Sequence, residues 1–337
     1  MRFMRTTFLC CLAIFWASSC AEEGESDSVD GGDTETETEI DTDGLFVESH
    51  EPEDGAVVQI NQKIHILFSG APPEQDYVDP ETVVVLVDGE PVRARPYFTN
   101  EAGNREFRFV PFPVWAPAEQ HEVTIVAGAA LAGDPEIRLA EDFVFGFTVD
   151  DTPFDEEYDP EATADLSTSE LAAMQAGGED AFLESNLVKD WDDPDSTLYN
   201  ISIPVRPDDP EVGAFALKLL DSQFPLGAVG LAAPQVAVGR RMFAADVNSE
   251  QRVFVNPRIV DWVEDDLYYG FAEGCLSIDG VSSFVGRPAW ITVEFDTPEG
   301  DHVEDYDLED FDAKVWLHEY DHINGILMTD REEGRTW

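Results

Sequence analysis

One short run, His318-Glu319-Tyr320-Asp321-His322, constrains this chain more than any other stretch. Residues four apart on a helix share a face, with Cβ atoms roughly 5–6 Å apart, so both imidazoles can reach one metal ion. Glu319 then lies beside the ligands, where its carboxylate can take a proton from a water at the metal. The run alone also fits an amphipathic helix whose two half-buried histidines make ordinary hydrogen bonds.

The flanking residues predict a buried helix over 311–324 that carries this run. Asp310 is expected to cap the N-terminus of this helix, and Gly325 is expected to end it. Apolar residues recur at helical spacing and share one broad stripe with the two histidines. The stripe consists of Phe311, Val315, Leu317, His318 and His322.

The charge of the chain excludes some partners. It has 72 acidic residues against 19 basic ones, a formal net charge of -53. Such a surface repels the phosphate backbone of nucleic acids and anionic membrane surfaces. We interpret the acidic residues mainly as a solvating surface, because no run matches an EF-hand calcium loop. The length of 337 residues and the 43% apolar content predict two domains plus tails.

Residues 1–20 have the pattern of an export signal. Arg2 and Arg5 give a positive start, and the apolar core over 8–17 is too short to span a membrane. The segment ends in Ala17-Ser18-Ser19-Cys20, which resembles a bacterial lipoprotein signal. This resemblance implies lipidation of Cys20 and a membrane-anchored, extracytoplasmic protein in the periplasm or at the cell surface. Plain secretion and a retained anchor stay open as alternatives.

Two further segments are acidic and poor in apolar residues. Residues 21–44 cannot bury a core, so they are predicted to form a disordered tether. Residues 151–185 are interpreted as an acidic linker with a local helix. A capping box at Ser167-Thr168-Ser169-Glu170 predicts the start of that helix, and Gly177-Gly178 is expected to interrupt it.

Residues 45–150 are rich in short β-type runs separated by turn residues, which predicts a small all-β sandwich. The predicted strands are 63–68, 82–87, 106–110, 122–127 and 143–149. Pro52-Glu53-Asp54-Gly55 and Phe145-Gly146-Phe147-Thr148-Val149 resemble parts of bacterial Ig-like domains. We interpret this domain as a spacer or adhesive module, in which His65 and His121 are structural or exposed.

From residue 186 to 337 the chain resembles the peptide deformylase family. Three motifs occur in the family's order: Gly230-Leu231-Ala232-Ala233-Pro234-Gln235, Glu273-Gly274-Cys275-Leu276-Ser277, and the run from His318 to His322 continued by Ile323-Asn324-Gly325. The resemblance implies an α+β catalytic domain with a central metal-binding helix, following the β-sandwich. It also implies a metallohydrolase that removes formyl groups from methionyl peptides.

Cysteine usage agrees with a metal site. Cys10 and Cys11 lie in the predicted signal and Cys20 is the predicted lipid site, so Cys275 has no disulfide partner. A thiolate with His318 and His322 gives three protein ligands and leaves a fourth position for water, as in catalytic sites. This donor set suits Zn²⁺ or Fe²⁺, and the family resemblance favours Fe²⁺. Taken alone, Cys275 also fits a small buried apolar residue.

The reaction assigns roles to further residues. Glu319 is the expected acid–base group. The resemblance implies that the Leu276 backbone N–H and the Gln235 side-chain amide hold the developing oxyanion. Asp321 is expected to orient the helix or a ligand histidine.

A second set of residues is expected to bind the substrate. Gly230 should allow close approach of the substrate backbone, and Gly274 lies in the turn that carries the thiolate. Val229, Val315 and Leu276 are plausible walls of an apolar pocket for a methionine-like side chain. For Arg287, contact with a substrate carbonyl or carboxylate and a structural salt bridge are both open.

The sequence departs from the family pattern at three positions. Ala228 stands at the usual first glycine of the first motif, Asp279 at a common proline, and Leu317 at the usual glutamine. The competing hypotheses are an exported hydrolase of formyl peptides or small amides, a surface binding protein with a catalytically silent module, and a general metallopeptidase. The last is disfavoured because a cysteine ligand is not a feature of His-Glu-x-x-His peptidases.

Overall fold

The structure is a computed structural model. It describes residues 45–69, 78, 82–91, 97–98, 106–112, 114–131, 135–150, 166–176, 181–193, 196–263 and 266–331. The chain divides into the units Met1–Ile40 and Asp41–Trp337, and every described residue belongs to the second. The predictions for residues 1–44, including the signal, Cys20 and the acidic tether, lie outside the described residues. Within the described ranges, no helix has the length and apolar character needed to cross a bilayer.

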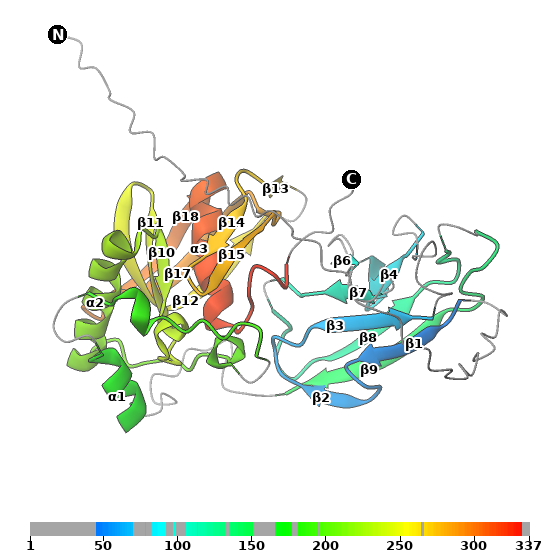
Figure 1. The fold of residues 1–337 in the computed structure, drawn as a ribbon, viewed down its shortest axis with the longest axis horizontal. Coiled ribbons are helices and arrows are strands. Elements are labelled where there is room, and N and C mark those ends of the chain that lie inside the picture. Colours follow the sequence, from blue (N-terminus) through cyan, green and yellow to red (C-terminus); the bar gives the residue numbers. More distant parts are fainter. Residues whose placement is uncertain are drawn as a thin grey trace, which may run out of the picture. The chain divides into compact units, whose positions relative to one another are not determined.

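The region from 45 to 150 is built from two sheets that share one core (Figure 1). The first sheet has the order β1 (Val47–Glu51), β3 (Ile64–Phe68), β7 (Glu106–Phe109) and β6 (Tyr97–Phe98). The second has the order β2 (Ala56–Val58), β9 (Phe143–Val149), β8 (Gln120–Ile125), β4 (Val85–Val87) and β5 (Glu90–Pro91). Alternate residues of β3 and β9 enter the shared core, as expected for strands with one buried face.

The predicted strands agree closely with β3, β7, β8 and β9. The strand predicted over 82–87 is shorter, because only Val85–Val87 pairs with its neighbours. The two histidines of this region make local polar contacts: His121 Nδ1 lies 2.8 Å from Asp88 Oδ2, and His65 Nδ1 lies 3.4 Å from Glu106 Oε1. They have no part in a metal cluster among the described residues.

Helix α1 (Thr168–Met174) begins at the predicted capping box. Ser167 Oγ accepts a hydrogen bond from the Glu170 backbone N–H at 3.2 Å, and Glu170 Oε2 accepts one from the Ser167 N–H at 2.8 Å. The predicted interruption at 177–178 lies outside the described residues. Met174 and Phe182 are buried in the same core as α2, so part of the segment interpreted as a linker packs on the following domain.

A five-stranded antiparallel sheet organises the region after residue 196. Its order is β10 (Gly230–Ala232), β11 (Met242–Val247), β12 (Glu250–Trp262), β17 (Trp290–Asp296) and β18 (His302–Glu309). Two small two-stranded sheets pair β13 (Leu267–Tyr268) with β16 (Arg287–Pro288), and β14 (Glu273–Cys275) with β15 (Ile278–Ser283). Three short 3₁₀ turns are η2 (Glu184–Asn186), η3 (Thr197–Tyr199) and η4 (Ala233–Val236).

Both faces of this sheet are covered by a helix (Figure 1). In β11, Met242 and Ala244 face the core that contains α2 (Pro210–Leu226), whereas Phe243 and Ala245 face the core that contains α3 (Asp310–Ile323). Successive residues of a strand point to opposite faces of the sheet. Because a helix covers each face, β11 is apolar on both sides. The helix that carries the two histidines is therefore fixed against the sheet.

Helix α3 confirms the predicted helix but not its predicted cap. The helix begins at Asp310, Glu309 occupies the N-cap position, and no side chain caps it. Gly325 has φ +69°, the left-handed conformation that ends helices, as predicted. Phe311 is 42% exposed, contrary to its place in the predicted buried stripe, because it lies in the first turn.

Side chains from 45–150 contact the later region. Phe112 packs against the core that contains α3, and Ile201 packs against the core of the two N-terminal sheets. Lys63 Nζ lies 2.5 Å from Asp330 Oδ1. Side chains of the two regions are therefore in direct contact.

Candidate active site

Strand β14 and helix α3 bring the three predicted metal ligands together. The Cys275 Sγ atom lies 3.3 Å from His322 Nε2. One candidate ligand atom from each of Cys275, His318 and His322 lies within 4.8 Å of the others. The ring centres of His318 and His322 are 5.1 Å apart, as expected for positions i and i+4 of one helix. The pairing predicted from spacing is therefore present in the fold.

The surroundings of these groups fit one metal ion. His318 Nδ1 lies 2.8 Å from Glu273 Oε2, which leaves its Nε2 for a metal. His322 Nδ1 is buried and has no hydrogen-bond partner among the described residues. Burial opposes ionisation of the Cys275 thiol, but the His322 and His318 imidazoles hold its pKa well below the ordinary value. A thiolate and two imidazoles are ligands that Zn²⁺ and Fe²⁺ accept.

Glu319 is placed beside the ligands as a buried acid. Its side chain is 4% exposed, and its Oε2 atom has no hydrogen-bond partner among the described residues. Burial raises the pKa of Glu319 to about 7. Gly230 faces this carboxyl so closely that a Cβ there would overlap it. The glycine expected to admit the substrate backbone thus makes room for the Glu319 side chain.

Gln235 presents its amide donor to the same site. Its Oε1 atom accepts a hydrogen bond from the Ala232 backbone N–H at 2.9 Å. Its Nε2 atom lies 3.5 Å from Cys275 Sγ and 3.3 Å from Ser277 Oγ. The amide orientation is consequently fixed with its N–H groups toward the thiolate. Leu276 follows Cys275 directly in the turn between β14 and β15.

Glu273 is a site residue that the sequence analysis did not single out. It is 7% exposed and accepts hydrogen bonds from Arg287 at 2.9 Å from both Nε and Nη2. The buried Lys314 Nζ lies 3.3 Å from Glu273 Oε1. Burial opposes ionisation, yet the Arg287 guanidinium and His318 hold the pKa of Glu273 well below its usual value. In the sequence, the signal that could have identified Glu273 is its position directly before Gly274-Cys275.

Arg287 corrects a prediction. It is 1% exposed and also donates to Asp321, so the guanidinium is surrounded by carboxylates and does not meet a substrate. The structural salt bridge is therefore the right one of the two alternatives. Among the described residues, Asp321 forms ion pairs with Arg287 and Arg331 and none with either histidine.

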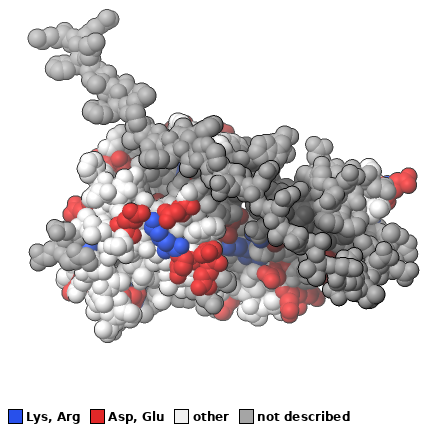
Figure 2. All heavy atoms as spheres, in the orientation of Figure 1, with Lys and Arg blue, Asp and Glu red and all other residues white. Residues whose placement is uncertain are grey.

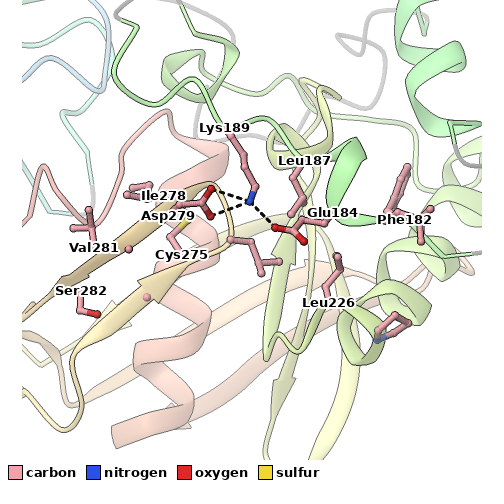
Figure 3. Close-up of a pocket in the computed structure, with 15 residues that line it drawn as sticks. Phe182, Glu184, Leu187, Lys189, Leu226, Cys275, Ile278, Asp279, Val281 and Ser282 are labelled. Atoms are coloured by element: carbon pink, nitrogen blue, oxygen red, sulfur yellow. Dashed lines mark hydrogen bonds and ion pairs between the residues drawn. The ribbon is translucent and has the colours of Figure 1, made fainter. Parts of the chain in front are cut away.

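A pocket of about 560 Å³ opens beside Cys275 (Figure 3). Gly274 and Leu276 line it, as expected for substrate-binding residues. Val229 and Val315 do not: Val229 is 49% exposed, and Val315 is buried in the core below α3. The other apolar walls come from Phe182, Leu183, Leu187, Pro225, Leu226, Ile278 and Val281.

Charged groups lie at one side of this pocket. Lys189 Nζ lies 2.9 Å from Asp279 Oδ1 and 3.0 Å from Glu184 Oε1 (Figure 3). Asp279, the departure from the family's common proline, thus anchors a lysine. On the face shown in Figure 2, acidic side chains are dispersed among uncharged ones, which agrees with a solvating surface.

A thiolate and two imidazoles that can hold one metal, beside a buried carboxyl and a fixed amide donor, form the site of a metallohydrolase. Comparisons with known proteins agree. Residues 188–336 match the family described as Polypeptide deformylase. The peptide deformylase of Afipia carboxidovorans is 39% identical over 142 residues, covering 41% of this chain and 81% of that protein.

A further relative supports the same assignment. The peptide deformylase of Treponema pallidum is 38% identical over 134 residues, which cover 40% of this chain and 81% of that protein. The crystal structure of the peptide deformylase from Thermotoga maritima is 32% identical, with a TM-score of 0.39; the match covers 41% of this chain and 92% of that one. The chain therefore belongs to the peptide deformylase family, and it is a deformylase-like hydrolase.

Proposed function

We propose that this protein is a metal-dependent hydrolase that releases formate from N-formyl-methionyl peptides or related small amides, and that it is exported and lipid-anchored. One observation carries the catalytic part. The Glu319 carboxyl is buried, its pKa is raised to about 7, and its Oε2 atom has no partner among the described residues. A buried acid with a raised pKa beside a metal-ligand set is suited to proton transfer.

Each residue of the site has a separate role in the proposed hydrolysis of an amide. Cys275, His318 and His322 would hold a divalent ion, which would supply the Lewis-acid chemistry that lowers the pKa of a water. Glu319 accepts the proton of the attacking water and delivers a proton to the leaving amine nitrogen. The formyl carbon–nitrogen bond breaks, and the products are formate and a free N-terminal amine.

The developing negative charge on the formyl oxygen needs donors that are already in place. The Gln235 Nε2 group is such a donor, because the Ala232 N–H holds its Oε1 atom in the opposite direction. The Leu276 backbone N–H is the second donor. A neutral amide suits this task because it adds no charge that competes with the metal.

The bound ion is proposed to be Fe²⁺ or Zn²⁺. Fe²⁺ is the ion that the family resemblance favours for activity, and Zn²⁺ is stable to oxygen outside the cytosol. Elemental analysis of the purified protein checks this: one equivalent per chain is expected, and Cys275→Ala should lower it sharply. Equal metal content in Cys275→Ala would contradict the ligand set.

The function is tested with the full chain, loaded with Fe²⁺ without oxygen or with Zn²⁺. Formate release is measured from an N-formyl-methionyl peptide, and its N-acetyl and free-amine forms serve as controls. The expected result is formate release from the formyl peptide and little or no reaction with the controls. Cleavage within the peptide would instead identify a metallopeptidase.

A surface binding protein with a catalytically silent module is the second candidate. Metal-loaded protein that binds the formyl peptide without releasing formate would identify this alternative.

Location and the N-terminal domain are also proposals. The Ala17-Ser18-Ser19-Cys20 pattern supports lipidation at Cys20, and intact-mass measurement of the native protein should show loss of residues 1–19 and added acyl mass. An unmodified Cys20 would contradict the anchor. Two sheets with one shared core support an Ig-like sandwich for 45–150.

A further inference from the structure

A continuous set of charged side chains leads away from the metal-ligand site. It begins at His318 Nδ1, which lies 2.8 Å from Glu273 Oε2, and Glu273 accepts two hydrogen bonds of 2.9 Å from Arg287. Arg287 donates to Asp321, which accepts two hydrogen bonds of 2.7 Å from Arg331. We call these five residues the charged chain.

The charged chain ends on the N-terminal sheet domain. Arg331 Nη1 donates to the Pro111 backbone carbonyl at 3.1 Å. The Arg331 guanidinium also lies 5.6 Å from the centre of the Phe112 ring, within the range of a cation–π interaction. Phe112 is held in turn by an edge contact to Trp262 of β12, at 5.9 Å between ring centres. Arg331 is thus fixed by Asp321 on one side and by residues 111–112 on the other.

Burial makes these links interdependent. The side chains of Glu273, Arg287, Asp321 and Arg331 are 5%, 1%, 3% and 9% exposed. A buried charge that loses its partner is costly, so its neighbours rearrange to compensate it. If Arg331 moves, Asp321 keeps Arg287 as its remaining partner in the charged chain. Asp321 then competes more strongly with Glu273 for the Arg287 guanidinium, which weakens the hold of Arg287 on Glu273, and Glu273 contacts His318.

We infer that residues 111–112 of the N-terminal sheet domain help to position the metal ligand His318, and that Arg331 is the positioning residue through which they act. The domain is therefore a working part of the hydrolase and not a passive spacer. This inference rests on the proposed function for its kinetic readout only. Its structural readout, the geometry of a metal at the site, is independent of turnover.

The test uses the full chain with Co²⁺ as a spectroscopic probe. Arg331→Met removes the link, and Phe112→Ala loosens it from the N-terminal side. Arg258→Met is the matched control, because Arg258 pairs with Glu294 outside the charged chain. Lys63→Met is the second control, because it removes another contact between the two regions, the ion pair with Asp330.

We expect Arg331→Met and Phe112→Ala to shift the visible absorption bands of bound Co²⁺ and to weaken Co²⁺ binding, by about tenfold for Arg331→Met. In the metal-loaded enzyme kcat should fall and KM should stay near that of wild type. Both controls should match wild type. Arg331→Lys, which restores the charge, should recover part of the spectrum and of the binding.

The inference would be overturned by an unchanged spectrum and affinity in Arg331→Met, or by the same changes in Lys63→Met as in Phe112→Ala, which would indicate general loosening of the contact between the two regions. If Arg331→Met does not fold, Phe112→Ala and Arg331→Lys decide the question. Spectral shifts without any formate release from wild type would remove the proposed function and leave this inference standing. Wild-type protein that binds no Co²⁺ would overturn both.

Discussion

A Cβ atom on Gly230 would lie 2.5 Å from Cδ and 2.7 Å from Cγ of Glu319. Ordinary contacts between carbon atoms are about 3.5–4.0 Å. β10 and α3 therefore approach so closely here that only a glycine leaves the Glu319 carboxyl in place. The glycine of the Gly-Leu-Ala-Ala-Pro-Gln motif and the second residue of the His-Glu-x-x-His run are therefore in direct contact.

This relationship predicts the effect of Gly230→Ala. The added methyl group must displace the Glu319 carboxyl, and Glu319 Oε2 has no hydrogen bond among the described residues to resist this. We expect turnover to fall about 10²-fold, the effect of moving a catalytic group by about 1 Å, with metal content unchanged. Gly239→Ala is the matched control, since no atom lies within 4 Å of a Cβ there. Wild-type turnover in Gly230→Ala would contradict the proposed position of the base.

Glu319→Gln separates catalysis from metal binding. Glutamine keeps the size of the side chain but cannot accept the proton of a water. We expect kcat to fall by about 10²–10⁴, with retained metal and little change in KM. His322→Ala should lose metal and activity together, and Glu304→Gln, at an exposed position, should leave both unchanged. If Glu319→Gln is as active as wild type, the hydrolase survives but its base lies elsewhere.

The raised pKa of Glu319 predicts the acid side of the pH profile. Burial raises this pKa from 4.5 to about 7, and a bound cation lowers it again by favouring the carboxylate. The base works when deprotonated, so kcat/KM should rise with pH and level off, with the midpoint between 4.5 and 7. Profiles of wild type and Glu319→Gln check this. If the residual kcat/KM of Glu319→Gln rises with pH in the same way, the titrating group is a residue other than Glu319.

Glu170 predicts a pH effect on stability away from the metal site. Burial acts to raise the pKa of Glu170, but hydrogen bonds from Arg240 and Ser167 lower it to about 2. A carboxyl with a lowered pKa stabilises the folded state above its unfolded value of 4.5, and this contribution is lost as the pH falls from 4.5 to 2.

Glu170→Gln should therefore lower Tm at neutral pH by about 2–4 °C, which corresponds to about 1 kcal/mol for a partly exposed pair. The difference from wild type should shrink as the pH falls below 4.5. Glu250→Gln, which alters a surface pair with Arg252, is the control and should change Tm little. If Glu170→Gln lowers Tm equally at pH 7 and pH 3, the charge of Glu170 does not contribute to the stability.

The sequence predicted what depends on local spacing. The two ligand histidines four apart on α3 and the capping box of α1 each follow from positions close in the chain. Cys275 joined the set because the three motifs together resemble one family. The sequence did not predict contacts between residues far apart in the chain. Glu273 contacts a histidine 45 positions away, and Phe112 packs on a core whose strands begin more than a hundred residues later. Such contacts depend on how the sheet and α3 are stacked, which no local pattern encodes.

Glu273→Gln tests the residue that sequence spacing could not assign. The substitution keeps the shape but leaves the buried Arg287 and Lys314 cations facing a neutral amide. Breaking a buried ion pair from one side costs about 3–5 kcal/mol, and a lost partner of a ligand histidine weakens metal binding about 10–100-fold.

We expect both effects, measured by thermal unfolding and by competition for Zn²⁺ with a chelator at a temperature where the variant is folded. Glu294→Gln, beside Arg258 on the sheet, removes a comparable carboxylate and should leave the metal affinity unchanged. Lower stability with wild-type metal affinity would show that Glu273 supports only the core. Loss of affinity in the folded variant would show that it orients His318.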